Sequence, residues 1–156
     1  MVRAAFREND RLEVSRARLS FVSLDLIMDD TVPISGDDAE MNAAMEEARR
    51  RLPEFRRALD QDARQTIPEI EGALVKASVS SVATGKTEHI WIEDAGFEDD
   101  MIVGTVSSEP NQIPEIAKGD WITVSPDDIS DWAYRQRDRT FGGFTIKVMQ
   151  RRGQKW

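Results

Sequence analysis

The sequence predicts one α+β domain, in which a main N-terminal helix packs on a bent antiparallel sheet, or small barrel, of about five strands. Two observations predict this fold. Between residues 41 and 59, apolar residues recur every three or four positions, as they do on one face of a helix. After Pro68 apolar and polar residues alternate, which is typical of strands with one buried face. A length of 156 residues fits a single domain with its own core.

Residues 1–36 are predicted to form an N-terminal extension to this domain. Between residues 19 and 27, apolar side chains fall on both alternating faces of a strand-like run. Residues 20–24 carry no charge and favour β-structure, so they would promote aggregation if left uncovered. We therefore expect the extension to pair in a sheet, to be covered, or to form a homodimer interface through residues 1–34.

The main helix is predicted to begin after Asp37 or Asp38, because either side chain can accept hydrogen bonds from the amides of the first turn. Pro53 lacks an amide hydrogen and clashes with the preceding turn. The helix is therefore expected to kink there, or to end and be followed by a second short helix. Its apolar stripe consists of Met41, Met45, Ala48, Leu52, Phe55 and Leu59.

Five strands are predicted after Pro68, in an order that suggests an antiparallel meander. Thr84-Gly85-Lys86 is expected to form the tight turn between the first two, and Gly96 through Asp100 to lead from the second into the third. Gly142-Gly143 in the last strand indicates a bulge or a close approach of two backbones. The predicted strands cover residues 74–82, 87–93, 101–107, 121–125 and 141–149.

A short helix is predicted over residues 126–134. Ser125 can cap it, Pro126 suits its first position, and two acidic residues would follow in its positive first turn. The α+β domain is then expected to span residues 37–149. Residues 150–156 are predicted to be a basic C-terminal tail.

The composition predicts a cytoplasmic protein. The chain has no Cys, which excludes disulfides and thiolate metal sites and suits a reducing compartment. Charged residues interrupt its first residues too early for the apolar stretch of a signal peptide. No run approaches the ~18 apolar residues of a membrane span, so no membrane partner is predicted.

The charge distribution argues against nucleic-acid binding, because phosphate contacts need a positive face and the net charge is −8. Between Glu88 and Asp131 there are 12 acidic residues and one Lys. Arginines gather instead between residues 49 and 57 and near the C-terminus. We interpret them as a solvated helix face and a tail, although they could also guide contact with a second copy or with an acidic partner.

The segment from residue 87 to residue 148 is where a site is most expected. It holds the only His, the only Tyr and three of the four Trp residues. On a strand, His89, Trp91 and Glu93 would project from one face. His89 is therefore the candidate general base, and the structural alternative is a half-exposed imidazole held by cross-strand hydrogen bonds.

The sequence contains no pattern typical of a metal site, a nucleophilic serine site or a phosphate-binding loop. One His and no Cys exclude the usual structural zinc sites, and neither acidic cluster, at residues 98–100 or 127–131, has the ligand spacing of a calcium loop. No Gly-x-Ser-x-Gly elbow and no phosphate-cradling glycine loop are present. We therefore predict no metal and no cofactor.

A set of polar and aromatic residues remains as a candidate ligand surface. By default, Glu109 or Asn111 would fix a turn, Asp120 would cap the loop into the fourth strand, and Trp132 would plug the end of the barrel. If these side chains instead line a cleft with His89, they would form a pocket with indole walls and a few directed polar groups. The predicted ligand-binding residues are His89, Trp91, Glu109, Asp131, Trp132 and Tyr134.

Several short motifs, in order, resemble a bacterial YegJ-like domain family of unknown function. The resemblance covers about residues 37–149 and implies a family but no established activity, substrate or catalytic residue. The motifs are Asp38-Ala39-Glu40-Met41-Asn42-Ala43-Ala44, Leu52-Pro53-Glu54-Phe55, Glu88-His89-Ile90-Trp91, Glu109-Pro110, Gly119-Asp120, Asp131-Trp132-Ala133-Tyr134 and Gly143-Phe144-Thr145-Ile146.

These observations favour a small, non-enzymatic binding or interaction module for an unidentified small ligand or protein. The reason is the enrichment in aromatic residues without a complete catalytic constellation. The alternative is a hydrolase-like enzyme in which His89 acts with a nearby carboxylate such as Glu93, Glu109 or Asp131. That alternative requires the imidazole to lie within hydrogen-bond reach of a carboxylate in a concave pocket.

Overall fold

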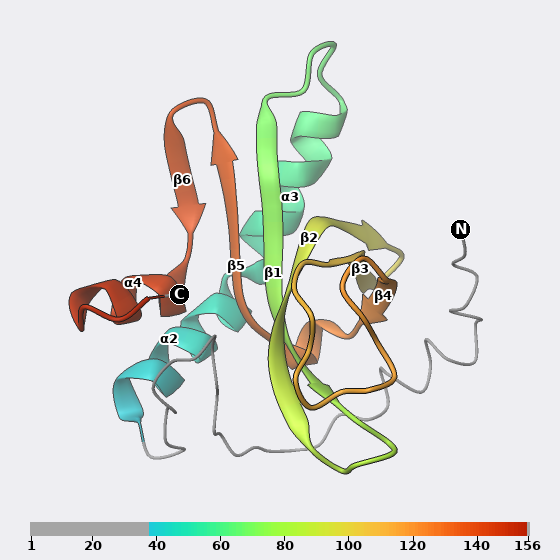
Figure 1. Ribbon diagram of the computed structural model, residues 1–156. Coiled ribbons are helices and arrows are strands. Elements are labelled where there is room, and N and C mark those ends of the chain that lie inside the picture. The colour runs from blue at the N-terminus through green and yellow to red at the C-terminus, as the bar shows by residue number, and fades with distance from the viewer. Residues whose placement is uncertain (1–37, 156) are drawn as a thin grey trace.

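Residues 38–155 are described by the computed structural model, and they form three α-helices and one six-stranded antiparallel sheet. Figure 1 shows the helices α2 (Ala39–Arg50) and α3 (Leu52–Ala63) behind the sheet and α4 (Phe144–Arg151) beside α2. The predicted α+β class is confirmed. The extension at residues 1–36 and the homodimer predicted through it lie outside the described residues.

The predicted main helix is present as two helices in close succession. Asp38 caps α2, since its carboxylate accepts a hydrogen bond from the amide of Met41 at 3.0 Å. Arg51 separates the helices, and Pro53 lies in the first turn of α3, where its missing amide hydrogen removes no helical bond. Most of the predicted stripe is buried, and its remaining members, Met45 and Leu59, are half-buried.

The sheet is open, with the strand order β4-β3-β2-β1-β5-β6. The barrel alternative is therefore wrong, because β4 and β6 form opposite edges. The first four strands follow each other as a meander, whereas β5 pairs with the other side of β1. The strands are β1 (Ile70–Ser80), β2 (Thr87–Glu98), β3 (Met101–Val106), β4 (Trp121–Val124), β5 (Ile129–Gln136) and β6 (Arg139–Gly142).

Two predicted elements are corrected. The helix predicted over residues 126–134 is only the 3₁₀ turn η2 (Pro126–Asp128), in which Ser125 accepts a hydrogen bond from the amide of Asp127. The following residues form β5, because β1 is buried and needs a second partner strand. The strand predicted over residues 141–149 is wrong beyond Gly142. The strand β6 ends at Gly142, and the chain then forms the helix α4, whose buried residues have helical spacing.

The C-terminal end of the chain is tied to the start of α2. Arg151 and Arg152, which the sequence placed in a basic tail, pair with Glu40, and Arg152 also pairs with Asp38. The hydrogen bonds from Arg152 lower the pKa of Asp38 to about 2. A small apolar cluster of Met41, Val148 and Met149 lies between the same two helices.

The main core lies between α2–α3 and the sheet. Phe55 is fully buried. Its ring contacts that of Phe97 in β2 and those of Trp132 and Tyr134 in β5, with ring centroids 5.2–6.0 Å apart. Alternate residues of β1 and β2, such as Val75 and Ile92, join this core. Their neighbours in sequence therefore project from the opposite face of the sheet.

Gly142 is required by the packing of Trp132. Its φ is +81°, and an added Cβ would lie 2.2 Å from the carbonyl oxygen of Trp132 and 2.7 Å from its ring. Replacing Gly142 with alanine is therefore expected to lower the free energy of unfolding by about 2–4 kcal/mol, measured by urea denaturation. Gly143→Ala is the matched control, since its φ is +70° but its nearest neighbours are 3.7 Å away. Equal losses in both variants would show that the contact with Trp132 does not matter.

Candidate functional site

The six predicted ligand-binding residues do not form one surface. Trp132 and Tyr134 face the helices and belong to the aromatic core. Asp131 pairs with Lys76 across the β1–β5 ladder, and Trp91 pairs with the same lysine across β1–β2. Glu109 lies in the loop after β3. These six side chains therefore do not form the single surface that the sequence suggested. Ligand binding by any one of them stays a prediction.

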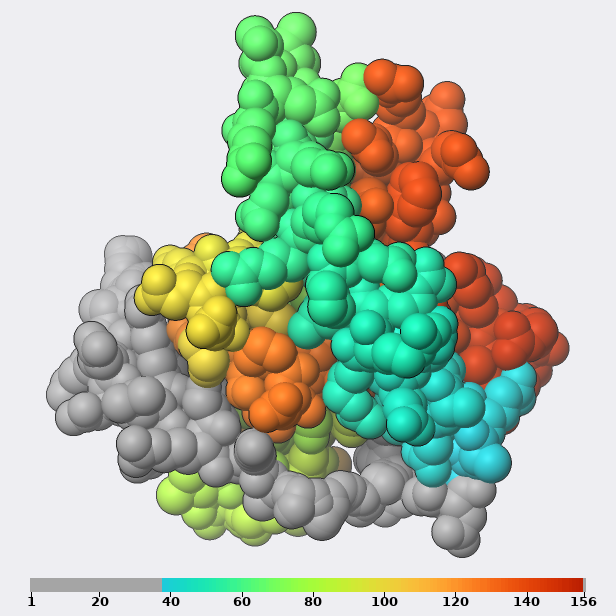
Figure 2. Space-filling view, turned by 180° about the vertical axis from the view of Figure 1, so that it is seen from behind, coloured from blue at the N-terminus to red at the C-terminus, as the bar shows by residue number. Residues whose placement is uncertain are grey.

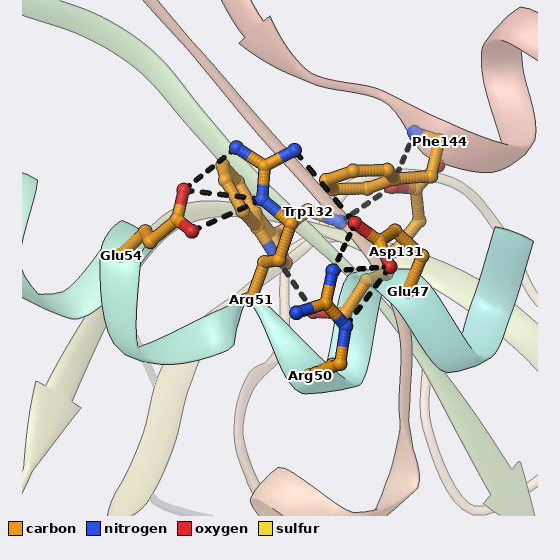
Figure 3. Close-up of polar contacts among 8 residues, drawn as sticks. Glu47, Arg50, Arg51, Glu54, Asp131, Trp132 and Phe144 are labelled. Carbon is orange, nitrogen blue, oxygen red and sulfur yellow. Dashed lines mark hydrogen bonds and ion pairs between the residues drawn. The ribbon is translucent and has the colours of Figure 1, made fainter.

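Trp132 is a structural residue. Its side chain is 2% exposed and stacks on Phe55 at 5.2 Å, while its indole N–H donates to the carbonyl of Ala48 at 2.8 Å. Figure 3 shows this bond reaching from the sheet to the helix. The indole therefore fixes α2 against β5, and it has no face left for a ligand.

Asp131 is the cap of α4. Gly143 precedes this helix and has no side chain to cap it. The fully buried carboxylate of Asp131 accepts hydrogen bonds from the amides of Phe144 and Thr145, each at 2.9 Å, and from the Thr145 hydroxyl. It also accepts one from the amide of Trp132, as Figure 3 shows together with the bond to Phe144. This carboxylate is fully engaged in holding the helix to the sheet.

Several acidic side chains of the central segment fix loops, as the default interpretation held. Glu109 accepts a hydrogen bond from the amide of Lys118, and Asp120 accepts one from Ala117. The loop between β3 and β4 is also held by Glu88, which is 8% exposed and accepts two backbone amides at 2.8 Å. Several acidic side chains of this segment therefore hold loop backbone in place by accepting hydrogen bonds from its amides.

Lys76, His89 and Trp91 form a polar cluster on the sheet. Lys76 is 2% exposed, and its ammonium lies 5.3 Å from the centre of the Trp91 ring. Burial lowers the pKa of Lys76 to about 8, partly opposed by the negative charge of Asp131. The indole N–H of Trp91 is buried without a hydrogen-bond partner. An unsatisfied buried donor of this kind needs an acceptor, such as a water molecule or a ligand oxygen.

His89 is held by a hydroxyl group instead of a carboxylate. Its Nδ1 lies 2.9 Å from Ser130 Oγ, and this hydroxyl donates its own hydrogen to the carbonyl of Lys76. Nδ1 must then carry the hydrogen and donate to Ser130. Ser130 is 1% exposed, so it is out of reach of a substrate as a nucleophile. The carboxylate dyad that the hydrolase-like alternative requires is not formed by the described residues.

The protonation of His89 is expected to destabilise the folded protein. Burial, assisted by the charges of Lys76 and Arg49, lowers the pKa of His89 from 6.5 to about 3. The unfolded chain therefore binds this proton at a higher pH than the folded protein, and stability should fall as pH falls from 6.5 towards 3. The urea midpoint should drop between about pH 7 and about pH 5, and His89→Gln should reduce that drop. An equal drop in both proteins would contradict this assignment.

An open groove of about 310 Å³ lies where α3, the end of β2 and η2 meet. On the face shown in Figure 2, the blue-green surface of the helices adjoins the yellow end of β2 and the orange segment that contains η2. The lining is mostly apolar, with two arginines and one acid: Arg49, Leu52, Pro53, Arg56, Phe97, Pro126 and Asp127.

Both arginines of the groove are held in place by backbone carbonyls. Arg49 donates to the carbonyl of Ile129 at 3.2 Å, and Arg56 donates to that of Asp99 at 2.8 Å. The guanidinium of Arg56 also lies 4.9 Å from the centre of the Phe97 ring, and its closest carboxylate, Asp100, is fully exposed and 3.6 Å away. Neither carbonyl carries a full charge, and the ion pair of Arg56 with the exposed Asp100 is of the weak surface kind, so a ligand carboxylate can compete for both cations.

Sequence reasoning missed this groove. It assigned the arginines between residues 49 and 57 to a solvated helix face. A signal was present, since Arg49 and Arg56 flank Leu52-Pro53 at the border of the apolar stripe. The opposite wall, however, is formed by Phe97 and Pro126, which only the sheet topology brings to this helix.

Comparison with known proteins places the chain among uncharacterised bacterial proteins. Residues 38–154 match the family described as "Uncharacterized protein conserved in bacteria (DUF2314)". The uncharacterized protein YegJ of Escherichia coli K12 is 30% identical over 75% of this chain and 72% of its own length. The "Putative ankyrin repeat protein" of Neisseria meningitidis serogroup B is 36% identical over 72% of this chain.

The chain spans about half of the Neisseria relative, 46% of its length. No solved structure matches the chain significantly. Within residues 38–155, the structure contains no helix with both the length and the apolar character that crossing a membrane requires.

Proposed function

We propose that this chain, which belongs to the uncharacterised bacterial family DUF2314, is a small non-enzymatic binding module that holds a carboxylate-bearing, partly apolar ligand in the groove of Arg49 and Arg56. The observation that carries the proposal is the pair of pre-oriented guanidinium groups beside an apolar floor. Arginine is the residue best suited to recognise carboxylates, because its planar fork can donate two parallel hydrogen bonds.

The fixed positions of the two arginines support binding. A free arginine side chain loses conformational entropy when it binds, whereas one already held by a carbonyl loses less. Leu52, Pro53 and Phe97 offer apolar surface between the charges, and Phe97 is itself fixed by its contact with Phe55. Apolar contact with a few directed polar groups is the usual composition of a binding site.

The relatives support a module that works beside other segments. A domain matched by about half of a longer protein can serve as one part of a larger assembly. The Neisseria relative is named as an ankyrin repeat protein, and ankyrin repeats stack into extended binding surfaces. A shared binding role is consistent with that association.

A second candidate binding position is the half-buried pair His89 and Trp91. The specific observation in its favour is the buried indole N–H of Trp91, which has no hydrogen-bond partner. A ligand carbonyl or carboxylate oxygen would satisfy this donor. The groove is favoured because its two cations and its apolar floor face one open space.

Charge removal in the groove tests the proposal. A fluorescein-labelled peptide with two Glu and two Pro residues is titrated with the full chain, and binding is followed by fluorescence polarisation. Arg49→Gln and Arg56→Gln should each weaken binding about fivefold, the upper range for one exposed ion pair. Arg57→Gln is the matched control, because Arg57 is exposed on α3 next to Arg56 but does not line the groove. Equal weakening by all three variants, or no binding, would overturn the proposal.

A further inference from the structure

We infer that the ligand of this groove is a polypeptide segment in the polyproline II conformation, with two acidic residues three positions apart and apolar residues between them. This inference rests on the proposed binding function and specifies the ligand. It follows from the spacing of the two arginines, the kind of side chain between them, and the charges around them.

The spacing of the arginines sets the spacing of the carboxylates. Arg49 and Arg56 are seven residues apart on α2 and α3, which follow each other through Arg51 with φ −98° and ψ 5°. Seven residues of a continuous helix rise about 10 Å at ~1.5 Å per residue, and a bend at Arg51 can only shorten this, so the backbone positions of the two arginines lie at most about 10 Å apart. In polyproline II, residues three apart lie on the same side of the chain and are separated by about 9 Å. In a β-strand the same two residues would project from opposite sides.

The floor between the arginines suits such a segment. It contains Pro53, Phe97 and Pro126 and is exposed along one side, so an extended ligand could enter without a conformational change. Grooves with aromatic and apolar walls recognise polyproline II segments, whose stiffness keeps the entropy lost on binding low. Apolar residues between the two acids would rest on this floor.

The surrounding charges favour two separate carboxylates over a polyanion. Asp127 belongs to the groove lining, and Asp99 and Asp100 lie next to Arg56. The whole chain carries a net charge of −8. A nucleic acid or an anionic lipid surface would bring many negative charges against these acids, whereas a short peptide brings only two carboxylates, one of which must displace the exposed Asp100 from Arg56.

A spacing series tests the inference. Three labelled peptides are compared by fluorescence polarisation with the full chain: Glu-Pro-Pro-Glu, the isomer Glu-Glu-Pro-Pro, and Gln-Pro-Pro-Gln, each with the same capped ends. Glu-Pro-Pro-Glu should bind about fivefold more tightly than its isomer, because only it reaches both arginines. In Arg49→Gln the two acidic peptides should bind alike.

The outcomes separate the inference from the proposed function. If both acidic peptides bind equally to the wild type, and Arg49→Gln and Arg56→Gln still weaken both, the groove binds carboxylates but the inferred spacing is wrong. If Gln-Pro-Pro-Gln binds as tightly as Glu-Pro-Pro-Glu, the requirement for two acids is wrong. If no peptide binds, the proposed function fails together with the inference.

Discussion

Replacing Asp131 with alanine is expected to lower the free energy of unfolding by roughly 3–5 kcal/mol, the range seen when one partner of a buried charged network is removed. The carboxylate is fully buried and accepts hydrogen bonds from three backbone amides within 2.9 Å and from the Thr145 hydroxyl. Its loss would leave these donors without an acceptor inside the protein. It would also remove the negative charge that favours the protonated form of Lys76.

Urea denaturation measures this effect, and Glu109→Ala provides the matched control. Glu109 belongs to the same predicted set, but it is exposed and accepts a single backbone amide. Its removal should cost about 1 kcal/mol or less. If Asp131→Ala were no more destabilising than Glu109→Ala, Asp131 would not be the cap that holds α4 to the sheet.

Replacing Trp132 with alanine should destabilise the protein by roughly 3–5 kcal/mol, as large-to-small changes of buried aromatic residues do. The indole is 2% exposed and contacts Phe55, Tyr134 and Phe144 with ring centroids 5.2–6.2 Å apart. A cavity would open between the helices and β5, and the carbonyl of Ala48 would lose its donor.

Trp132→Phe separates packing from hydrogen bonding. Phenylalanine retains an aromatic ring against Phe55 but cannot donate to Ala48, so the loss should fall to about 1–3 kcal/mol, measured in the same urea experiment. An alanine variant as stable as the phenylalanine variant would show that the stacked rings contribute little.

Local patterns predicted the elements that depend on local chemistry. The cap at Asp38, the burial of the helical stripe and the Ser125 cap all follow from side chains close in sequence. The strand predicted over residues 141–149 was wrong beyond Gly142 because the local pattern is ambiguous there. Phe141 to Met149 fits both alternating and helical spacing, and two glycines with positive φ end the strand where the pattern alone would continue it.

The candidate site was harder to predict, because it depends on contacts between distant segments. His89, Asp131 and Trp132 were singled out as rare or clustered residues, yet the pairing of β5 with β1 gives them separate roles. Trp132 becomes core, Asp131 becomes a helix cap, and His89 binds a buried hydroxyl. The groove arises only where η2 and the end of β2 approach α3, and no local pattern shows that approach.

The position of a bound acidic peptide on the full chain distinguishes binding in the groove from binding at Trp91 and His89. Amide and indole resonances of isotopically labelled protein are recorded while unlabelled Glu-Pro-Pro-Glu is added. We expect the largest shifts to cluster at Arg49, Arg56 and Phe97 and to be lost in the double variant Arg49→Gln/Arg56→Gln. Shifts centred on the Trp91 indole and His89, with the groove unchanged, would contradict it.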